Sequence, residues 1–393
     1  MAGTFSNVRM LMVTPNYPPQ LGGTQTYSFE LARQFNAVCG DFLVFAPQVR
    51  GSQEFDAQHE VPIIRHKDPG DNFALSGRLP LHKIFLNREF EIVMCTHWSA
   101  AFAASQAMRK YKGSRPKPKL ACAAHGKELL IRPLRRLPFL QGIYDKIRRS
   151  AFENTDHIFP VSGFTGRLLR DCGVETSKIA VVNNGVDPNY FYPSPSQTTL
   201  SNDNLQTGNV ILTVARLVPR KGIDLTLSVL GLVRQEIPDV RYVIVGDGPD
   251  RHRLKKLAEK YGVSDSVQFI GYCSSVELRT HYQDCDLFLL PASSKCPDVE
   301  GFGLSILEAS ACGKPVLGST EGGIPDAILD GTTGLTVDLA NPTALAEAAI
   351  RILKNPTLAR KFGRAGRTHT STKANWSSTA HQILQAISAS SPD

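Results

Sequence analysis

The chain has 393 residues, and at about 100–200 residues per domain this length favours two domains over one. Hydrophobic residues make up 42% and charged residues 20%, which excludes a disordered chain and allows sizeable cores. No apolar run approaches the roughly 18 residues of a membrane span, and we expect no signal peptide because no basic patch leads into an apolar stretch near the N-terminus. None of the eight cysteines forms a C-x-x-C pair, so we expect a reduced, cytoplasmic protein.

The net charge of +8 is unevenly distributed along the chain. Residues 1–190 hold 24 Lys and Arg against 16 Asp and Glu, whereas residues 191–393 hold 20 of each. The segment 109–149 alone holds 13 basic and two acidic residues, so the excess is local. Such an excess predicts an anionic partner: a lipid headgroup, a nucleic acid or a phosphorylated substrate.

In the first half of the chain, short apolar runs alternate with helical patterns. The expected strands cover 8–13, 42–46, 91–95, 120–124 and 157–161, and the expected helices cover 27–35, 99–110 and 165–171. Continuous apolar strands that alternate with helices are typical of a parallel sheet covered on both faces.

The same rhythm restarts after a stretch at 193–208 that is rich in Ser, Thr, Asn and Pro, which predicts a linker. The strands expected beyond it cover 210–214, 241–245, 267–270, 287–290 and 315–317, and the helices cover 224–235, 251–261, 306–311, 344–353 and 374–389. The sequence therefore predicts two open α/β domains in tandem.

Open parallel sheets bind ligands at the carboxyl ends of their strands, so we searched the residues that follow each strand. Gly22-Gly23 follows the first strand and precedes a helix, where free N–H groups favour a phosphate, although such a loop can also simply turn. His125 and His97 each follow a strand and could hydrogen-bond a substrate, unless they are structural histidines. Ser162 could contact an acceptor, but a helix N-cap is its simpler role.

In the second half, Arg216 ends one strand and Lys221 lies near the start of the next helix. Two cations at this position suit a phosphate, with a solvated basic loop as the alternative. Glu300 lies in a glycine-rich loop, and Glu308 is flanked by apolar residues on the helix that follows. A buried carboxylate is costly without a partner, and a ribose diol would satisfy Glu308 well, unless it is simply an exposed glutamate.

The motifs Arg216-x4-Lys221-Gly222, Val245-Gly-Asp-Gly-Pro249 and Glu300-x7-Glu308 together resemble those of the retaining glycosyltransferases of family 4. The segment His125-Gly-Lys-Glu128 is similar to that of the bacterial phosphatidylinositol mannosyltransferases. The resemblance implies the GT-B fold, with two Rossmann-like domains and a cleft between them. It also implies an acceptor domain at 1–190, a linker at 191–209, a nucleotide-sugar domain at 210–370, and a last helix within 371–393 that crosses back to the first domain.

The resemblance also implies a role for each candidate residue. Arg216 and Lys221 would hold the donor diphosphate, and Glu308 would bind the ribose. Glu300 would bind the sugar hydroxyls, and His125 would lie near the reacting carbon. The other implied donor contacts are Gly22, Gly23, Gly246, Ile270, Gly271, Tyr272, Gly301, Phe302, Gly303 and Leu304, and His97 and Ser162 are candidate acceptor contacts.

For the chemistry, the resemblance implies transfer of a hexose from GDP-mannose or a UDP-hexose with retention at the anomeric carbon. Front-face attack would leave the protein to position the substrates and stabilise the leaving diphosphate. The pair Asp284 and Asp286 precedes a strand and so lies at the wrong end of the sheet for a metal that bridges the diphosphate. We therefore expect no metal and no other cofactor.

The basic segment 109–149 interleaves apolar and aromatic residues with its cations, which suits an anionic membrane surface. This pattern predicts a lipid- or polyprenyl-linked or glycan acceptor, with the protein peripheral on the inner face of the plasma membrane. The alternative is a solvated segment in an enzyme with a small-molecule acceptor. A nucleic-acid-binding protein is a third possibility, but no recognised motif accompanies the charge, so we expect no nucleic acid.

The spacing of Glu300 and Glu308 disfavours an epimerase, and the absence of an obvious cofactor lysine disfavours a phosphorylase.

Overall fold

The computed structural model describes residues 5–67, 72–111, 116–194, 209–293 and 298–389. The chain divides into two compact units, one made of 1–182 with 376–393 and the other of 183–375. The division therefore falls eight residues before the boundary expected at 190. Most of the expected linker, 195–208, lies outside the described residues.

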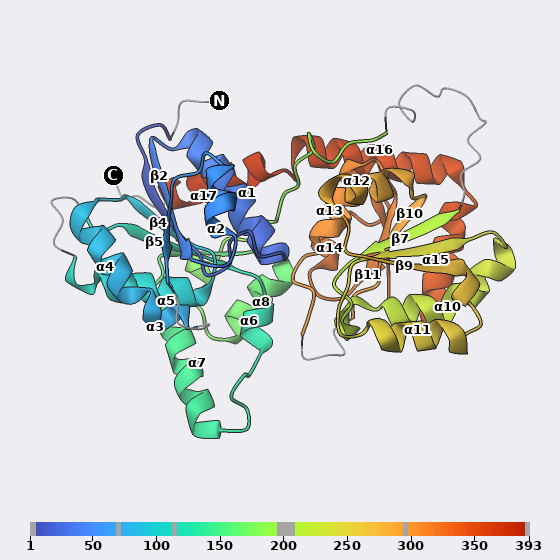
Figure 1. The fold of residues 1–393 in the computed structure, drawn as a ribbon, viewed down its shortest axis with the longest axis horizontal. Coiled ribbons are helices and arrows are strands. Elements are labelled where there is room, and N and C mark those ends of the chain that lie inside the picture. Colours follow the sequence, from blue (N-terminus) through green and yellow to red (C-terminus); the bar gives the residue numbers. More distant parts are fainter. Residues whose placement is uncertain (1–4, 68–71, 112–115, 195–208, 294–297, 390–393) are drawn as a thin grey trace. The chain divides into compact units, whose positions relative to one another are not determined.

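The first unit is a six-stranded sheet with helices on both faces, and all its strand pairs are parallel (Figure 1). The strand order is β3-β2-β1-β4-β5-β6. Its elements are β1 (Arg9–Val13), α1 (Gly23–Val38), β2 (Asp41–Pro47), α2 (Ser52–Ala57), β3 (Ile63–His66), α3 (Phe73–Ser76), α4 (Arg78–Asn87), β4 (Ile92–Cys95), α5 (Trp98–Ala107), η1 (Met108–Lys110), β5 (Lys119–Ala124), α6 (Lys127–Leu130), α7 (Pro138–Glu153), β6 (His157–Pro160), α8 (Gly163–Asp171), η2 (Thr176–Lys178) and α17 (Trp376–Ala389).

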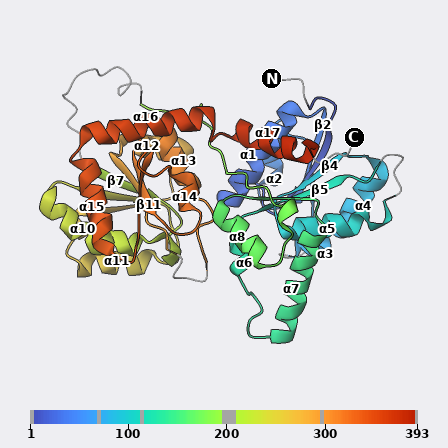
Figure 2. The same ribbon diagram turned by 180° about the vertical axis from the view of Figure 1, so that it is seen from behind.

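The second unit repeats this design with the strand order β12-β11-β10-β7-β8-β9, again entirely parallel (Figure 2). Its elements are β7 (Val210–Val214), η3 (Pro219–Lys221), α10 (Ile223–Glu236), β8 (Arg241–Val245), α11 (Arg251–Lys260), η4 (Ser264–Ser266), β9 (Val267–Gly271), α12 (Ser275–Asp284), β10 (Leu287–Leu290), α13 (Leu304–Ala311), β11 (Val316–Ser319), α14 (Ile324–Ala327), β12 (Gly334–Val337), α15 (Pro342–Leu353) and α16 (Pro356–Thr372). The prediction of two open parallel α/β domains is confirmed.

Burial on both faces explains why the strands are apolar along their whole length. In β1, Leu11 and Val13 belong to one core cluster, while Met10 and Met12, which alternate with them, are also fully buried. Side chains on a strand point alternately to the two faces, so helices must cover both of them. In the second unit, Ile211 and Leu287 join a corresponding cluster with residues of α10, α11 and α15.

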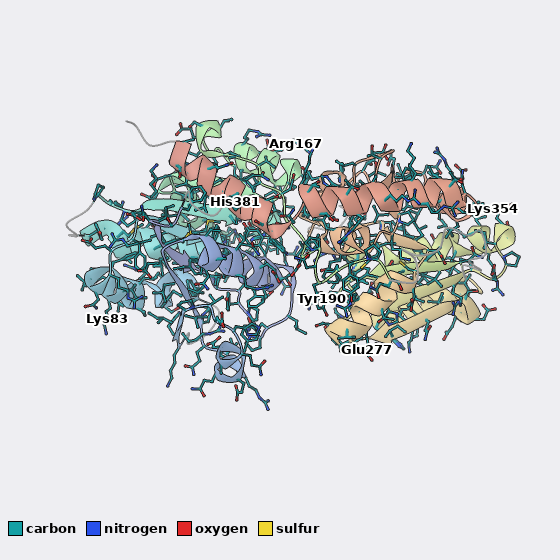
Figure 3. All side chains as sticks on the ribbon, turned by 90° about the horizontal axis from the view of Figure 1, so that it is seen from above. Lys83, Arg167, Tyr190, Glu277, Lys354 and His381 are labelled. Carbon is teal, nitrogen blue, oxygen red and sulfur yellow. The ribbon has the colours of Figure 1, made fainter. Side chains whose placement is uncertain are left out.

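The last helix, α17, belongs to the first unit although it follows the second in the chain. It packs against α1, where the rings of Trp376 and Tyr27 meet edge to face at a centroid distance of 5.9 Å. His381, labelled in Figure 3, makes a similar contact with Phe5 at 6.2 Å. The first unit is therefore completed by residues from the far end of the sequence.

Each sheet reverses its winding direction at one place. The chain steps outward from β1 through β2 to β3, and then returns to place β4 on the other side of β1. In the second sheet, the same reversal separates β7 from β10. The loops that leave neighbouring strands diverge at such switch points and leave room for a ligand.

Candidate active site

The second unit brings Lys221 and Glu300 together at its switch point. Lys221 ends η3, in the loop after β7, and Glu300 lies in the loop after β10. Lys221 Nζ lies 2.5 Å from Glu300 Oε2, and Arg220 Nη1 lies 2.7 Å from the same oxygen. Lys221 and Glu300, which are 79 positions apart in the sequence, thus form a buried ion pair. They meet because the loops after neighbouring parallel strands lie at the same edge of the sheet.

Burial and the neighbouring charges change the pKa values of both Lys221 and Glu300. Burial raises the pKa of Glu300, but the charges of Lys221 and Arg220 outweigh it, so the net shift is downward. Burial lowers the pKa of Lys221, and Glu300 opposes that effect. The carboxylate is therefore ionised at neutral pH and holds the positive charge of Lys221 in a largely dry environment.

Arg220 is a member of this cluster that the sequence did not single out. Its Nε donates to Asp298 Oδ2 at 2.9 Å while its Nη1 binds Glu300, so it links two carboxylates of one loop. Arg216, in contrast, is exposed, and its side chain makes no hydrogen bond or ion pair within the described residues. The two predicted cations are therefore different: Lys221 is already paired with a carboxylate, whereas Arg216 faces solvent at the end of β7.

The loop after β11 supports the backbone next to Glu300, which the sequence analysis also missed. The Gly323 N–H donates to the carbonyl oxygen of Glu300 at 2.9 Å. A Cβ atom on Gly323 would lie 1.9 Å from the carbonyl oxygen of Gly301, so only glycine fits there. Gly303 then caps α13, whose first residue is Leu304, and Phe302 is buried beside it.

Glu308 lies on α13 and is half-buried. Its Oε2 accepts a hydrogen bond from the hydroxyl of Tyr282 at 2.5 Å. Burial raises the pKa of Glu308, while Tyr282 and the charge of Lys221 oppose this effect. The sequence predicted a buried carboxylate in need of a partner; the Glu308 side chain is half-buried, and a tyrosine of α12 is one such partner.

The remaining residues predicted to contact the donor lie just after β8 and at the end of β9. Gly246 donates its N–H to the carbonyl oxygen of Gly271 at 2.8 Å, which joins the two loops. Ile270 is half-buried in β9, and the Tyr272 side chain is 72% exposed. The pair Asp284 and Asp286 lies before β10, where Asp286 Oδ2 accepts from the Val210 N–H at 2.8 Å. That acidic pair is therefore at the amino edge of the sheet, as predicted.

In the first unit, Gly22 is the N-cap of α1 and Gly23 is the first residue of the helix. Gly22 has a φ of +153°, a backbone conformation that residues with a Cβ atom rarely adopt, so the turn favours glycine. Both glycines are exposed, which leaves the first turn of α1 accessible to a ligand.

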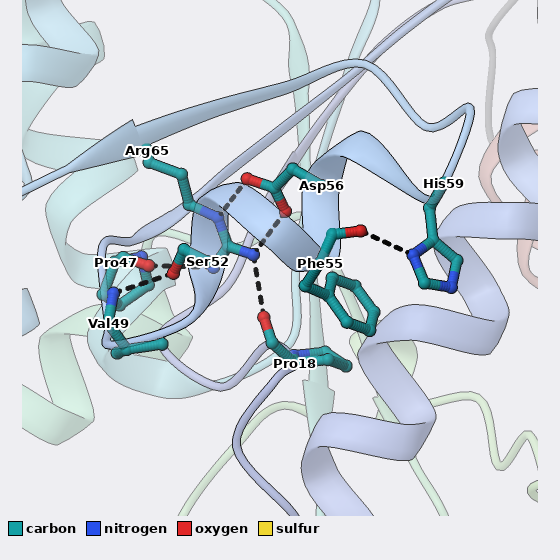
Figure 4. Close-up of polar contacts among 8 residues, drawn as sticks. All are labelled: Pro18, Pro47, Val49, Ser52, Phe55, Asp56, His59 and Arg65. Carbon is teal, nitrogen blue, oxygen red and sulfur yellow. Dashed lines mark hydrogen bonds and ion pairs between the residues drawn. The ribbon is translucent and has the colours of Figure 1, made fainter.

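The loop before these glycines is held by Arg65 of β3 (Figure 4). Its guanidinium donates to both carboxylate oxygens of Asp56, at 3.0 and 2.7 Å. It also donates to the carbonyl oxygens of Pro47 and Pro18, at 2.9 and 2.7 Å, and lies over the ring of Tyr17. A strand that the sequence analysis missed thus anchors the loop between β1 and α1.

His125 and His97 follow β5 and β4, next to the switch point of the first sheet. His125 Nε2 lies 3.0 Å from the carbonyl oxygen of Thr96, and its ring stacks edge-on against Tyr27. His97 is the N-cap of α5 and accepts from the Ser99 N–H through Nδ1. Burial lowers the pKa of both histidines, to about 4 for His97, so both rings are neutral at pH 7.

Ser162 is completely buried. Its Oγ accepts from the Thr165 N–H at 3.1 Å and so caps α8. This N-cap is the simpler role that the sequence analysis gave to Ser162.

A second candidate surface lies at the N-terminal end of α7, which extends away from the rest of the first unit in Figures 1 and 2. Four apolar side chains there are 42–79% exposed, with Phe139 the most exposed. Three arginines beside them are also exposed. We call this surface the α7 tip; its residues are Arg132, Arg135, Arg136, Leu137, Phe139, Leu140 and Ile143.

The structure divides the basic segment 109–149 into separate parts. Lys117 precedes β5 and Lys119 is its first residue, whereas the α7 tip follows the strand, so β5 carries the chain from one edge of the sheet to the other between them. Lys119 Nζ donates to the carbonyl oxygen of Ile387. Residues 112–115 lie outside the described residues. The prediction of a membrane-binding surface in this segment therefore rests on the α7 tip.

Two residues expected to contribute to that surface are structural instead. Arg148 Nη1 donates to the carbonyl oxygen of Glu128 at 2.7 Å, and its Nη2 binds Asp145 at 2.8 Å. The ring of Tyr144 packs edge-on against Trp98 at 5.2 Å. Arg148 thus fastens α7 to α6 and Tyr144 fastens it to α5, which leaves the tip as the exposed part. No helix in the described ranges has both the length and the apolarity to span a bilayer.

Comparison with known proteins agrees with this geometry. Residues 21–190 match the family model Glycosyltransferase Family 4, and residues 198–369 match the model Glycosyl transferases group 1. The chain is 28% identical to a GDP-mannose-dependent alpha-(1-6)-phosphatidylinositol monomannoside mannosyltransferase of Mycobacterium tuberculosis, over 96% of this chain and 98% of that protein. It is also 28% identical to an alpha-maltose-1-phosphate synthase of Mycolicibacterium smegmatis, over 96% and 98%.

Solved structures agree on the fold. The structure of Anabaena HepE in complex with UDP matches with a TM-score of 0.76 at 18% identity, over 97% of this chain and all of that one. Two six-stranded parallel sheets in tandem, with this likeness, identify the GT-B fold. The chain therefore belongs to the glycosyltransferases, with a Glycosyltransferase Family 4 domain followed by a Glycosyl transferases group 1 domain, and it is an enzyme of that class.

Proposed function

We propose that this glycosyltransferase transfers mannose from GDP-mannose to a lipid-linked acceptor of the phosphatidylinositol mannoside type. The donor is supported by the relative from Mycobacterium tuberculosis, whose similarity extends over 98% of its length. The observation that carries the acceptor is the α7 tip. Exposed apolar side chains surrounded by arginines are unfavourable in water and favourable at an anionic bilayer.

In this proposal, the second unit holds the donor. Arg216 and Lys221 balance the charge that develops on the departing diphosphate, which is the main protein contribution when transfer proceeds with retention. Glu308 accepts hydrogen bonds from the ribose, and Glu300 accepts them from the sugar. Glu300 is bound to Lys221 and Arg220, so these ion pairs hold the groups that would meet the sugar and the phosphate in a fixed orientation.

Residues of the first unit have proposed roles of their own. Gly22 and Gly23 present the exposed first turn of α1 to an anionic group, as helix N-termini commonly do. His125 is neutral and its Nε2 contacts the Thr96 carbonyl, so Nδ1 is the nitrogen left to accept a hydrogen bond from a substrate hydroxyl.

A substrate screen tests the proposal directly. The full chain is incubated with GDP-mannose, UDP-glucose or ADP-glucose, with phosphatidylinositol monomannoside or glucose 1-phosphate as acceptor. We expect acceptor-dependent release of GDP, and a product whose added mannose keeps the α configuration of the donor by NMR. Release of another nucleotide, or transfer only to the phosphorylated small molecule, would contradict the proposal and favour the type of reaction that the Mycolicibacterium smegmatis relative is named for.

Replacement of Glu308 by alanine is expected to weaken GDP binding by about 1–3 kcal/mol, the cost of a lost hydrogen bond to a charged group. Calorimetry with the full chain measures this difference. Glu347→Ala removes an exposed glutamate from α15 and is the matched control. Equal GDP affinity in both variants would remove Glu308 from the nucleotide site.

We also propose that transfer needs no metal ion, because Arg216 and Lys221 supply positive charge where a metal would act. Initial rates measured in excess EDTA are expected to equal those without it. Loss of activity in EDTA that Mg²⁺ or Mn²⁺ restores would overturn this expectation. Thermal melting in the same buffers shows whether EDTA acts on the reaction or on the fold.

A further inference from the structure

Tyr282 and Glu308 form a contact that the proposed reaction does not yet use. Tyr282 lies near the end of α12 and Glu308 lies in the middle of α13, 26 residues later. The distance between Tyr282 Oη and Glu308 Oε2 is 2.5 Å, which is short for a hydroxyl bound to a carboxylate. It joins two helices of the second unit at one of the candidate donor residues.

Tyr282 is held rigidly. Its side chain is completely buried. Its ring meets that of Phe191 edge to face at 5.7 Å and lies beside that of Phe288 at 5.8 Å. Burial raises the pKa of Tyr282 far above its usual range, so the hydroxyl keeps its proton and acts as the donor. The hydroxyl therefore has a fixed position and direction.

Glu308 has one oxygen fixed by this bond and one still able to accept. The Glu308 side chain makes no other hydrogen bond within the described residues, and it is half-buried rather than sealed. A glutamate side chain that is not held has several rotamers, and ordering them on ligand binding costs free energy. A bond to Oε2 removes that cost in advance and leaves Oε1 for the ligand.

We propose that Tyr282 is a positioning residue that holds Glu308 in the orientation required to bind the ribose hydroxyls of the donor nucleotide. This inference rests on the proposed role of Glu308. It adds that the nucleotide site extends to α12, in which the sequence shows no motif. Tyr282 itself needs no contact with the donor.

The bond also predicts a pH effect. The charged and titratable groups near Glu308 are Tyr282, Lys221 and Cys312, and the first two lower the pKa of Glu308 against the effect of burial. Removing the hydroxyl removes one of these effects, so the carboxylate takes up its proton at a higher pH. Nucleotide binding needs the ionised carboxylate. As the pH is lowered, binding should therefore begin to weaken at a higher pH in the variant than in the wild type.

The test compares Tyr282→Phe with the wild type by calorimetry of GDP and UDP between pH 5 and pH 8. We expect Tyr282→Phe to weaken nucleotide binding about tenfold, as for one hydrogen bond to a charged group, and to move the acid limb to higher pH. Tyr242→Phe removes another fully buried hydroxyl, bound to Thr213 in β7, and is the matched control.

The same change in a Glu308→Ala background shows whether Tyr282 acts through Glu308. There, Tyr282→Phe should have no further effect on affinity. An equal loss with and without Glu308, or an unchanged affinity and pH profile in Tyr282→Phe, would overturn the inference while nucleotide binding itself remains. A wild-type chain that binds neither GDP nor UDP would overturn the proposed function as well, so the two failures are distinguishable.

Discussion

Replacement of Lys221 by alanine is expected to lower the turnover number by about 100- to 1,000-fold, the usual loss when one group that stabilises developing charge is removed. The Lys221 side chain is buried at the end of η3, where low exposure strengthens its electrostatic effect. The donor's KM should change much less than the turnover number, because the diphosphate gains charge only as the sugar departs. Steady-state rates with GDP-mannose measure both quantities.

Two controls accompany this experiment. Lys256→Ala removes an exposed lysine from α11 of the same unit and should leave the rate unchanged. Lys221→Arg keeps the charge and should retain more activity than the alanine variant. Arg220 still neutralises Glu300 when Lys221 is absent, so we expect the variant to fold, which thermal melting verifies. A turnover number within about threefold of the wild-type value would exclude Lys221 from charge stabilisation. Such a change corresponds to much less than the roughly 1.4 kcal/mol of a tenfold change in rate.

Replacement of Arg132, Arg135 and Arg136 by serine is expected to reduce binding to anionic vesicles by about 100-fold. Each cation near an anionic surface contributes about 1 kcal/mol, and three such contributions give roughly this factor. All three side chains are exposed, so the fold should not change. Co-sedimentation with vesicles that contain phosphatidylserine or phosphatidylinositol measures the effect, and added salt should weaken wild-type binding.

A matched control removes the same number of exposed cations from the second unit. Arg360, Lys361 and Arg364 lie on α16 of the second unit, and their replacement by serine should leave vesicle binding intact. Phe139→Ser tests the apolar part of the tip separately, since its side chain is 79% exposed and supports no core. Equal recovery of the wild-type chain in the supernatant with neutral and anionic vesicles would remove the membrane surface from the proposal, but not the transferase activity.

The central strands of both sheets could be predicted from the sequence because they are buried on both faces. Strands such as β7 (Val210–Val214), β8 (Arg241–Val245) and β10 (Leu287–Leu290) occupy the predicted residues. The edge strands β3 and β12 were missed. β3 contains Arg65 and an exposed Ile64, and β12 is half-buried beyond its first residue, so neither has a continuous apolar run.

Several helices were missed for a related reason. The helices α2, α3, α4, α6, α7, α12, α14 and α16 lie in segments where charged and polar residues dilute the apolar pattern, or are too short to show a period. Apolar side chains are usually buried and charged ones exposed. In α7, however, the apolar side chains of the tip are exposed and Arg148 faces inward. Only packing against Trp98 and α6 shows which side chains of α7 face the sheet.

By itself, the sequence determined the fold class, the two units and the strand ends at which the candidate residues lie, because these depend on local patterns of apolar residues, glycines and charges. The tertiary structure alone decided which residues meet. The contacts of Lys221 with Glu300, of Tyr282 with Glu308, and of Arg65 with the Pro18 loop join residues 26 to 79 positions apart. Such partners are set by which strands and helices become neighbours, and no local pattern records that choice.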